Sequence, residues 1–154
     1  MHAMVAAPPT ETQPAELRHC RVRLATGPAA AGEARRQVRA AIRDWDLPAD
    51  PDVALLLTSE LVTNAIMHEA GESITLGIRC FRGRLRVDVY DTSRSFPVVT
   101  AAEGDAETGR GLMLVDTLAT GWGFYRTPAG KAVYFTLGAD GDHTALADGW
   151  PVLG

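Results

Sequence analysis

Residues 60 to 68 read ELVTNAIMH, and this stretch decides the fold because it places polar side chains at helical intervals in an apolar segment. Glu60 and Asn64 lie one helical turn apart and point the same way, and His68 follows one turn later, about 80° round the helix from Glu60. The other side chains are apolar nearly all round, which is typical of a buried helix. A buried glutamate and asparagine need partners, and Mg²⁺ with its phosphates would supply them. The stretch alone leaves open an amphipathic helix with solvated polar side chains.

The composition indicates one ordinary globular domain. The chain has 154 residues, of which 46% are hydrophobic and 22% are charged, with a formal net charge of -4. This charge argues against a general nucleic-acid surface, and we expect no direct nucleic-acid partner. No stretch reaches the roughly 18 apolar residues of a membrane span, and the two cysteines show no disulfide or metal spacing, so we expect a cytoplasmic protein with no membrane partner. Residues 1–16 are expected to be a disordered leader, 17–138 the domain, and 139–154 a tail.

Hydrophobic periodicity predicts long helices followed by antiparallel hairpins. Helices are expected at about residues 29–45 and 51–69, the second with Asp50 as its N-cap, and a third helix is expected to open at Gly111. Strands are expected at residues 20–24, 74–80, 85–90, 121–125 and 133–137, with Arg82-Gly83 as the turn of the first hairpin. The predicted fold class is α+β: a two-layer sandwich with a mixed, mostly antiparallel sheet and helices on one face.

Chemistry-bearing features follow one another along this expected fold. The polar helix comes first, then Asp91 at a strand end, then an aperiodic stretch typical of a lid, and then Gly109-Arg110-Gly111-Leu112 at an expected helix start. A carboxylate such as Asp91 can accept a hydrogen bond from the exocyclic amine of adenine, and backbone N–H groups at a helix start can cradle phosphate. The chain contains neither a P-loop nor a G-x-G-x-x-G turn after a first strand, so neither common phosphate cradle is available.

In this order and spacing the features resemble the ATP-binding domain of histidine kinases, gyrase-type topoisomerases, heat-shock chaperones and MutL-type repair proteins. This is the GHKL superfamily, with its Bergerat-type ATP-binding fold, and the resemblance spans about residues 17–138. Within it, the segments ELVTNAIMH, GRGLMLVD, GWG and GKAVYF look most like the stand-alone anti-sigma-factor serine/threonine kinases of actinobacteria.

The resemblance implies roles for individual residues. Glu60 would be the catalytic base, Asn64 the Mg²⁺ ligand, and Asp91 the residue that reads adenine. The implied cofactors are ATP and Mg²⁺. The nucleotide-binding residues implied by the resemblance are Asn64, His68 on the phosphate side, Asp91, Ser93, the lid hinges Gly109 and Gly111, Arg110 and Leu112.

The sequence departs from the family in the adenine-side motif. Relatives carry D-x-G-x-G there, whereas this chain reads Asp91-Thr92-Ser93-Arg94-Ser95. Glycine permits positive φ and close backbone approach, so serine at both positions can narrow the pocket. Lys131 also follows Gly130 where relatives often carry a hydroxyl residue near adenine.

Three functions remain open at this stage. The first is an anti-sigma-factor-like serine/threonine protein kinase that phosphorylates a small antagonist protein to regulate transcription, with a sigma factor or that antagonist as partner and a possible homodimer. The second is a degenerate anti-sigma factor: a partner-binding module without kinase activity that uses nucleotide as a switch or not at all. The third is plain ATP hydrolysis. Glu60 and Asn64 with helix-end amides would suffice for phosphoryl transfer, which relies mainly on positioning and charge neutralisation.

Overall fold

The computed structural model describes residues 17–68, 71–93, 106–138 and residue 150. The elements along the chain are β1 (Arg18–Ala25), α2 (Ala30–Asp44), α3 (Pro51–Met67), β2 (Ser73–Phe81), β3 (Arg84–Asp91), α4 (Ala106–Leu118), β4 (Gly121–Arg126) and β5 (Lys131–Leu137). The expected leader, residues 1–16, and the expected tail, residues 139–154, lie outside the described residues, apart from Trp150.

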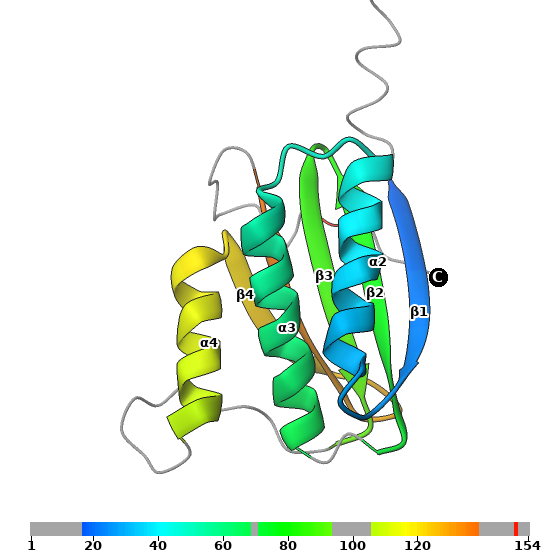
Figure 1. Ribbon diagram of the computed structural model, residues 1–154, viewed down its shortest axis with the longest axis vertical. Coiled ribbons are helices and arrows are strands. Elements are labelled where there is room, and N and C mark those ends of the chain that lie inside the picture. Colours follow the sequence, from blue (N-terminus) through cyan, green and yellow to red (C-terminus); the bar gives the residue numbers. More distant parts are fainter. Residues whose placement is uncertain (1–16, 69–70, 94–105, 139–149, 151–154) are drawn as a thin grey trace, which may run out of the picture.

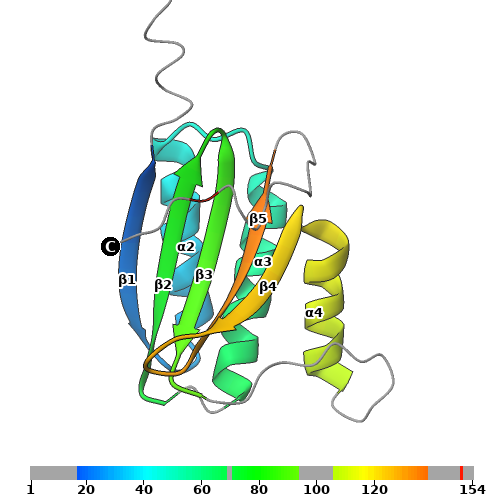
Figure 2. The ribbon, with the colours of Figure 1, turned by 180° about the vertical axis from the view of Figure 1, so that it is seen from behind.

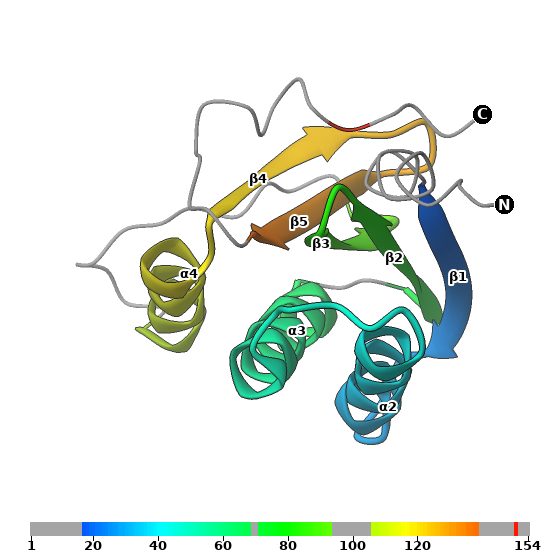
Figure 3. The ribbon, with the colours of Figure 1, turned by 90° about the horizontal axis from the view of Figure 1, so that it is seen from above.

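The strands form one sheet in the order β1-β2-β3-β5-β4, and each pairing is antiparallel. The described helices α2, α3 and α4 all cover the same face of this sheet, and Figures 1, 2 and 3 show that no described helix covers the other face. The predicted two-layer α+β fold is therefore confirmed. The described sheet is antiparallel throughout rather than mixed.

Helix α3 lies at the centre of the helix layer and packs against both α2 and α4 (Figure 3). Its buried residues include Leu57, Leu61 and Val62, which contact the apolar face of the sheet in a single core. Neighbours on both sides explain why this helix is apolar nearly all round. The predicted N-cap is confirmed, since the Asp50 side chain accepts a hydrogen bond of 2.9 Å from the N–H of Asp52.

The first hairpin has the predicted two-residue turn. Arg82 and Gly83 have φ values of 56° and 75°, and this pair of positive values matches the twist of the flanking strands. Strands β2 and β3 then pair in a register that sets Arg79 opposite Arg86 and Gly77 opposite Asp88. Alternate residues of β3 thus face the helices, as Val87 and Val89 do in the core, or the open face of the sheet.

The predicted start of the third helix was wrong. Helix α4 begins at Ala106, so Gly109, Arg110 and Gly111 lie inside it rather than at its N-terminus. Alanine and glutamate at positions 106 and 107 favour the helix, and a glycine in a helix costs only about 1 kcal/mol, which does not stop it. The backbone N–H of Gly111 is therefore not among the free amides of a helix start. Among the described residues, no helix combines the length and apolar character that crossing a membrane requires.

Candidate functional site

The candidate site lies at one end of the sandwich, between the helices and the sheet. Helix α3 ends there, β3 ends there, and β5 and α4 begin there, as Figures 1 and 2 show. The antiparallel topology therefore collects segments that are far apart in the sequence. It brings the end of ELVTNAIMH, Asp91 and Lys131 to the same end of the molecule.

Asn64 on α3 is a buried polar side chain whose oxygen has no partner. The residue is 6% exposed, and no described group donates a hydrogen bond to its Oδ1 atom. His68, the C-cap of α3, is half-buried, and its Nε2 atom likewise has no partner among the described residues. A buried polar atom left without a partner costs about 1–3 kcal/mol, so these two atoms need a partner that the described residues do not supply, such as water, an ion or a ligand. The roles of Asn64 and His68 toward Mg²⁺ and phosphate stay predictions.

Glu60 is half-buried, one turn before Asn64 on the same helix. Burial raises the pKa of the Glu60 carboxyl above its ordinary value, because the charged form loses hydration. A raised pKa brings a carboxylate closer to the range in which it accepts and returns a proton efficiently. Glu60 thus has the chemical character of a general base.

Asp91 carries a feature that sequence reasoning missed: it forms a buried ion pair with Lys131. The Nζ atom of Lys131 donates to both carboxylate oxygens, at 3.0 Å to Oδ1 and 2.9 Å to Oδ2, and the two side chains are only 2% and 1% exposed. The pair forms because Asp91 and Lys131 are directly opposite in the β3–β5 register. An acidic strand end and a basic strand start were visible in the sequence, but their pairing depends on that register.

Gly130 holds this ion pair in place. A Cβ atom at position 130 would lie 2.3 Å from the carbonyl oxygen of Asp91 and 2.6 Å from the Cα atom of Thr92. The turn is closed by Thr127, whose backbone oxygen and Oγ1 atom accept from the Gly130 N–H at 3.2 and 3.0 Å. Only glycine fits this close backbone approach, which sets Lys131 against Asp91.

Ser93 is compatible with the local backbone despite standing where relatives carry glycine. Its N–H donates a hydrogen bond of 2.8 Å to Asp91 Oδ1, and its φ is not positive. This local turn needs no glycine, so the substitution itself imposes no backbone strain. Ser95 lies outside the described residues.

The other predicted site residues lie on α4. Leu112 is 1% exposed and belongs to the hydrophobic core. Gly109, Arg110 and Gly111 are placed in the helix backbone, and the stretch 94–105, expected to be a lid, lies outside the described residues. Their roles toward a nucleotide stay predictions.

The donor set fits a hard cation held mainly by phosphate. In the part of the chain that the structure describes, no three His, Cys, Asp or Glu side chains gather closely enough to hold a metal. The unpartnered Asn64 oxygen would instead serve as one protein ligand, which is how Mg²⁺ is commonly held together with substrate phosphates.

The Asp91–Lys131 ion pair keeps one acceptor and one donor position. Asp91 Oδ1 already accepts two hydrogen bonds, from Ser93 and Lys131, whereas Oδ2 accepts one. A carboxylate oxygen accepts two, and an ammonium donates three, so Oδ2 and Lys131 each retain one position. The amino and N1 groups of adenine are a donor beside an acceptor, which is the matching pattern.

Comparison with known proteins agrees with the fold described above. No curated protein sequence is significantly similar to the chain. The crystal structure of the RsbU and RsbW domains of Rv1364c from Mycobacterium tuberculosis is similar in fold, with a TM-score of 0.59 and 19% sequence identity over 79% of this chain. The match covers 32% of that longer chain. The histidine kinase-like ATPase domain family matches residues 24–137, nearly all of the described fold, and the chain belongs to this family.

Proposed function

We propose that the protein binds Mg-ATP between its helix layer and the sheet and transfers the γ-phosphoryl group to a serine or threonine of a small antagonist protein, as an anti-sigma-factor-like kinase that regulates transcription. The observation that carries this proposal is the buried, unpartnered Asn64 oxygen one turn from Glu60. Membership of the ATPase domain family supports the nucleotide, and the fold shared with a structure that contains an RsbW domain supports the kinase class.

Asn64 and Glu60 have separate tasks in this proposal. Mg²⁺ bound beside Asn64 would neutralise phosphate charge. Asn64 Oδ1 would bind the cation, and His68 Nε2, the next unpartnered atom on α3, would contact the phosphates. Glu60, whose pKa burial raises, accepts the proton of the attacking hydroxyl.

The Asp91–Lys131 pair reads the base. Asp91 Oδ2 accepts from the adenine amino group, and Lys131, held by both carboxylate oxygens, donates to N1. Lys131 thus takes a position that a hydroxyl residue often occupies in relatives. Ser93 fixes the carboxylate through its N–H. Gly109, Arg110, Gly111 and Leu112 remain the proposed lid segment, working as part of helix α4 rather than as its start.

A second candidate function is favoured by the same ion pair. Lys131 neutralises the carboxylate that relatives leave for adenine, so a protein that had lost nucleotide binding would be stabilised by this contact. Such a protein would be a partner-binding module that captures a sigma factor or its antagonist without phosphoryl transfer. In either case we propose a cytoplasmic protein with protein partners, able to form a homodimer.

Turnover separates the two candidates without knowledge of the partner. The purified protein is incubated in excess over Mg-ATP, and formation of ADP is followed by chromatography. A kinase of this kind should form ADP slowly. Glu60→Gln should abolish ADP formation while ATP still binds. The control Glu72→Gln, which changes an exposed glutamate outside the site, should leave ADP formation unchanged.

Equal ADP formation by wild type and Glu60→Gln would exclude Glu60 as the base. Nucleotide binding without any ADP from the wild type would favour the partner-binding module. Addition of the antagonist protein, once known, should raise its mass by one phosphate only under the kinase proposal.

A further inference from the structure

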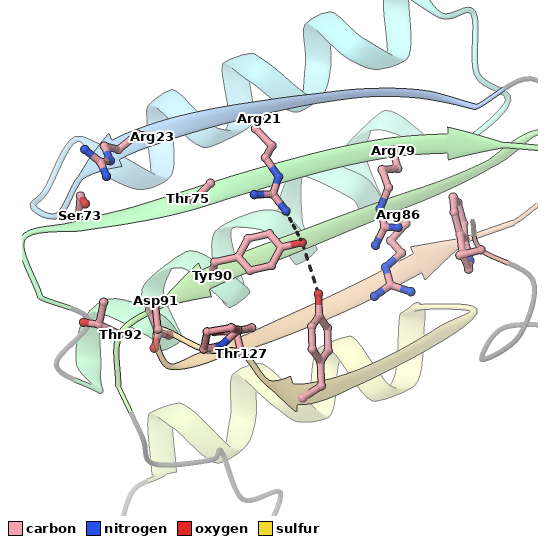
Figure 4. Close-up of a pocket in the computed structure, with 14 residues that line it drawn as sticks. Arg21, Arg23, Ser73, Thr75, Arg79, Arg86, Tyr90, Asp91, Thr92 and Thr127 are labelled. Carbon is pink, nitrogen blue, oxygen red and sulfur yellow. Dashed lines mark hydrogen bonds between the residues drawn. The ribbon is translucent and has the colours of Figure 1, made fainter. Parts of the chain in front are cut away.

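The face of the sheet opposite the helices carries a cavity that shares one residue, Asp91 at its rim, with the proposed nucleotide site. It has a volume of about 700 Å³ and lies over strands β1 to β4 (Figure 4). This is within the range of small-molecule sites, roughly 300–1,000 Å³. Arginines, hydroxyl residues and tyrosines line it. The sheet separates its body from Asn64 and Glu60, which lie on the helix side.

Asp88 lies buried behind three of the lining residues, Arg79, Arg86 and Tyr125, and its hydrogen-bonding capacity is used in full. Its Oδ1 atom accepts from Arg86 Nε at 2.9 Å and from Arg79 at 3.2 Å. Its Oδ2 atom accepts from Arg86 at 2.9 Å and from the hydroxyl of Tyr125 at 2.9 Å. A carboxylate offers about four acceptor positions, so Asp88 has none left for a ligand.

The arginines exceed the acidic charge around them. Arg79 and Arg86 stand directly opposite each other on β2 and β3 and share the single charge of Asp88. Arg21 and Arg23 on β1 also line the cavity, and no described carboxylate lies within ion-pair distance of either. Asp91, also at the rim, is neutralised by Lys131. Among the described residues that line the cavity, positive charge and hydrogen-bond donors therefore exceed negative charge.

Two tyrosines tie the arginines into one preorganised network. Arg21 donates to the Tyr90 hydroxyl at 3.3 Å and lies 4.7 Å from its ring centroid, and the hydroxyls of Tyr90 and Tyr125 are 3.4 Å apart. Figure 4 shows the side chains of Arg21, Arg79 and Arg86 directed toward the cavity. The chain thus connects Arg21 to the Asp88 centre through hydrogen bonds, which fixes these donors before any ligand arrives.

Glycines leave room for the rings of this network. A Cβ atom on Gly77 would lie 3.3 Å from the ring of Tyr90, and one on Gly123 would lie 3.0 Å from the ring of Tyr134. Contacts this short would displace the rings. Of these two rings, that of Tyr90 lines the cavity, so Gly77 is the glycine that sets the position of a lining ring.

We infer that this cavity is a second binding site, for a small organic phosphate. An occupant must bring acceptors and negative charge, because the described lining offers donors in surplus and its carboxylate, Asp91, is paired with Lys131. A phosphate group has about two negative charges and three acceptor oxygens. It can therefore bind several arginine side chains at once, whereas a carboxylate has one charge and two oxygens. The tyrosine rings, Pro128 and Ala129 provide the apolar wall for the organic part. This inference does not depend on nucleotide binding at the helix side.

Phenyl phosphate is the test probe, titrated by calorimetry into the full chain. The variant Arg21→Gln/Arg23→Gln removes two exposed arginines of the cavity but none of the groups that bind Asp88 directly. The matched control Arg39→Gln/Arg43→Gln removes the same charge from the exposed side of α2. Saturable binding is expected for wild type and control, with affinity reduced about tenfold or more in the β1 variant. Benzyl alcohol, which lacks the charge, should not bind.

Several results would overturn the inference. They are an absence of phenyl phosphate binding to the wild type, an equal loss of affinity in both double variants, or a loss caused by Asn64→Ala, which would place the probe on the helix side. Sedimentation provides a further check: a wild-type dimer that Arg21→Gln/Arg23→Gln dissociates would show that a second copy, not a phosphate, covers this face.

Discussion

Replacing Lys131 by methionine removes the positive member of the buried ion pair and leaves the Asp91 carboxylate without its counter-charge. The Nζ atom lies 2.9 and 3.0 Å from the two carboxylate oxygens, and both side chains are almost completely buried. Methionine fills a similar volume, so the main change is electrostatic. One N–H donor to the carboxylate then remains, from the backbone of Ser93.

The expected loss is large. Removing one partner of a buried ion pair costs about 3–5 kcal/mol, because the other charge stays buried and uncompensated. For a domain of this size, such a loss lowers the melting temperature by roughly 10–20 °C. Adding Asp91→Asn to Lys131→Met removes both charges, so the double variant should be more stable than Lys131→Met alone.

Urea unfolding followed by circular dichroism measures these differences. Arg43→Met is the control, since Arg43 and Asp44 form an exposed ion pair whose loss should change the free energy of unfolding by less than about 1 kcal/mol. If Lys131→Met and Arg43→Met destabilised the protein equally, or if Asp91→Asn made Lys131→Met worse, the ion pair would not be part of the fold.

Three further predictions follow from single side chains. Burial raises the pKa of Glu60, so its ionised form is disfavoured in the folded state. Glu60→Gln should therefore increase the free energy of unfolding at about pH 7 but not at about pH 3. Urea melts at both pH values measure this difference. Gly130→Ala should destabilise the protein by about 3 kcal/mol or more through backbone clashes, as thermal melts would show. Gly32→Ala should instead stabilise it by about 0.5–1 kcal/mol, because Gly32 lies in helix α2 and an added Cβ atom would make only an ordinary contact of 3.6 Å with the Arg35 side chain. Burial, and after it the negative charge of Asp88, raises the pKa of the Tyr125 hydroxyl well above that of an ordinary tyrosine. Ultraviolet titration should therefore find one tyrosine that ionises only on unfolding, and Tyr125→Phe should abolish that signal.

Local patterns in the sequence were enough to predict most of the fold. The apolar run around Leu57 and Leu61, the Asp50 cap and the Arg82-Gly83 turn each act over a few residues, and the structure confirms all of them. The start of α4 was predicted wrongly because glycine was taken as a helix boundary. Glycine only weakens a helix, and the preceding residues continue it.

Long-range pairing accounts for what the sequence did not reveal. Asp91 and Lys131 are separated by 40 positions and meet only through the β3–β5 register. The arginines of β2 and β3 alternate with apolar residues and are typical of a solvent-facing strand surface, yet Arg79 and Arg86 are buried around Asp88. Their burial depends on how neighbouring strands align, which no single segment encodes.

The central claim is that Asn64 holds the cation of Mg-ATP, and calorimetry of nucleotide binding tests it most directly. The control variant Thr63→Ala removes an exposed side chain next to Asn64 on the same helix. Wild type and this control should bind ATP in the presence of Mg²⁺ and much more weakly in its absence. Asn64→Ala should weaken Mg-ATP binding by about tenfold or more. Equal Mg-ATP affinity of Asn64→Ala and wild type, with both folded, would contradict the account.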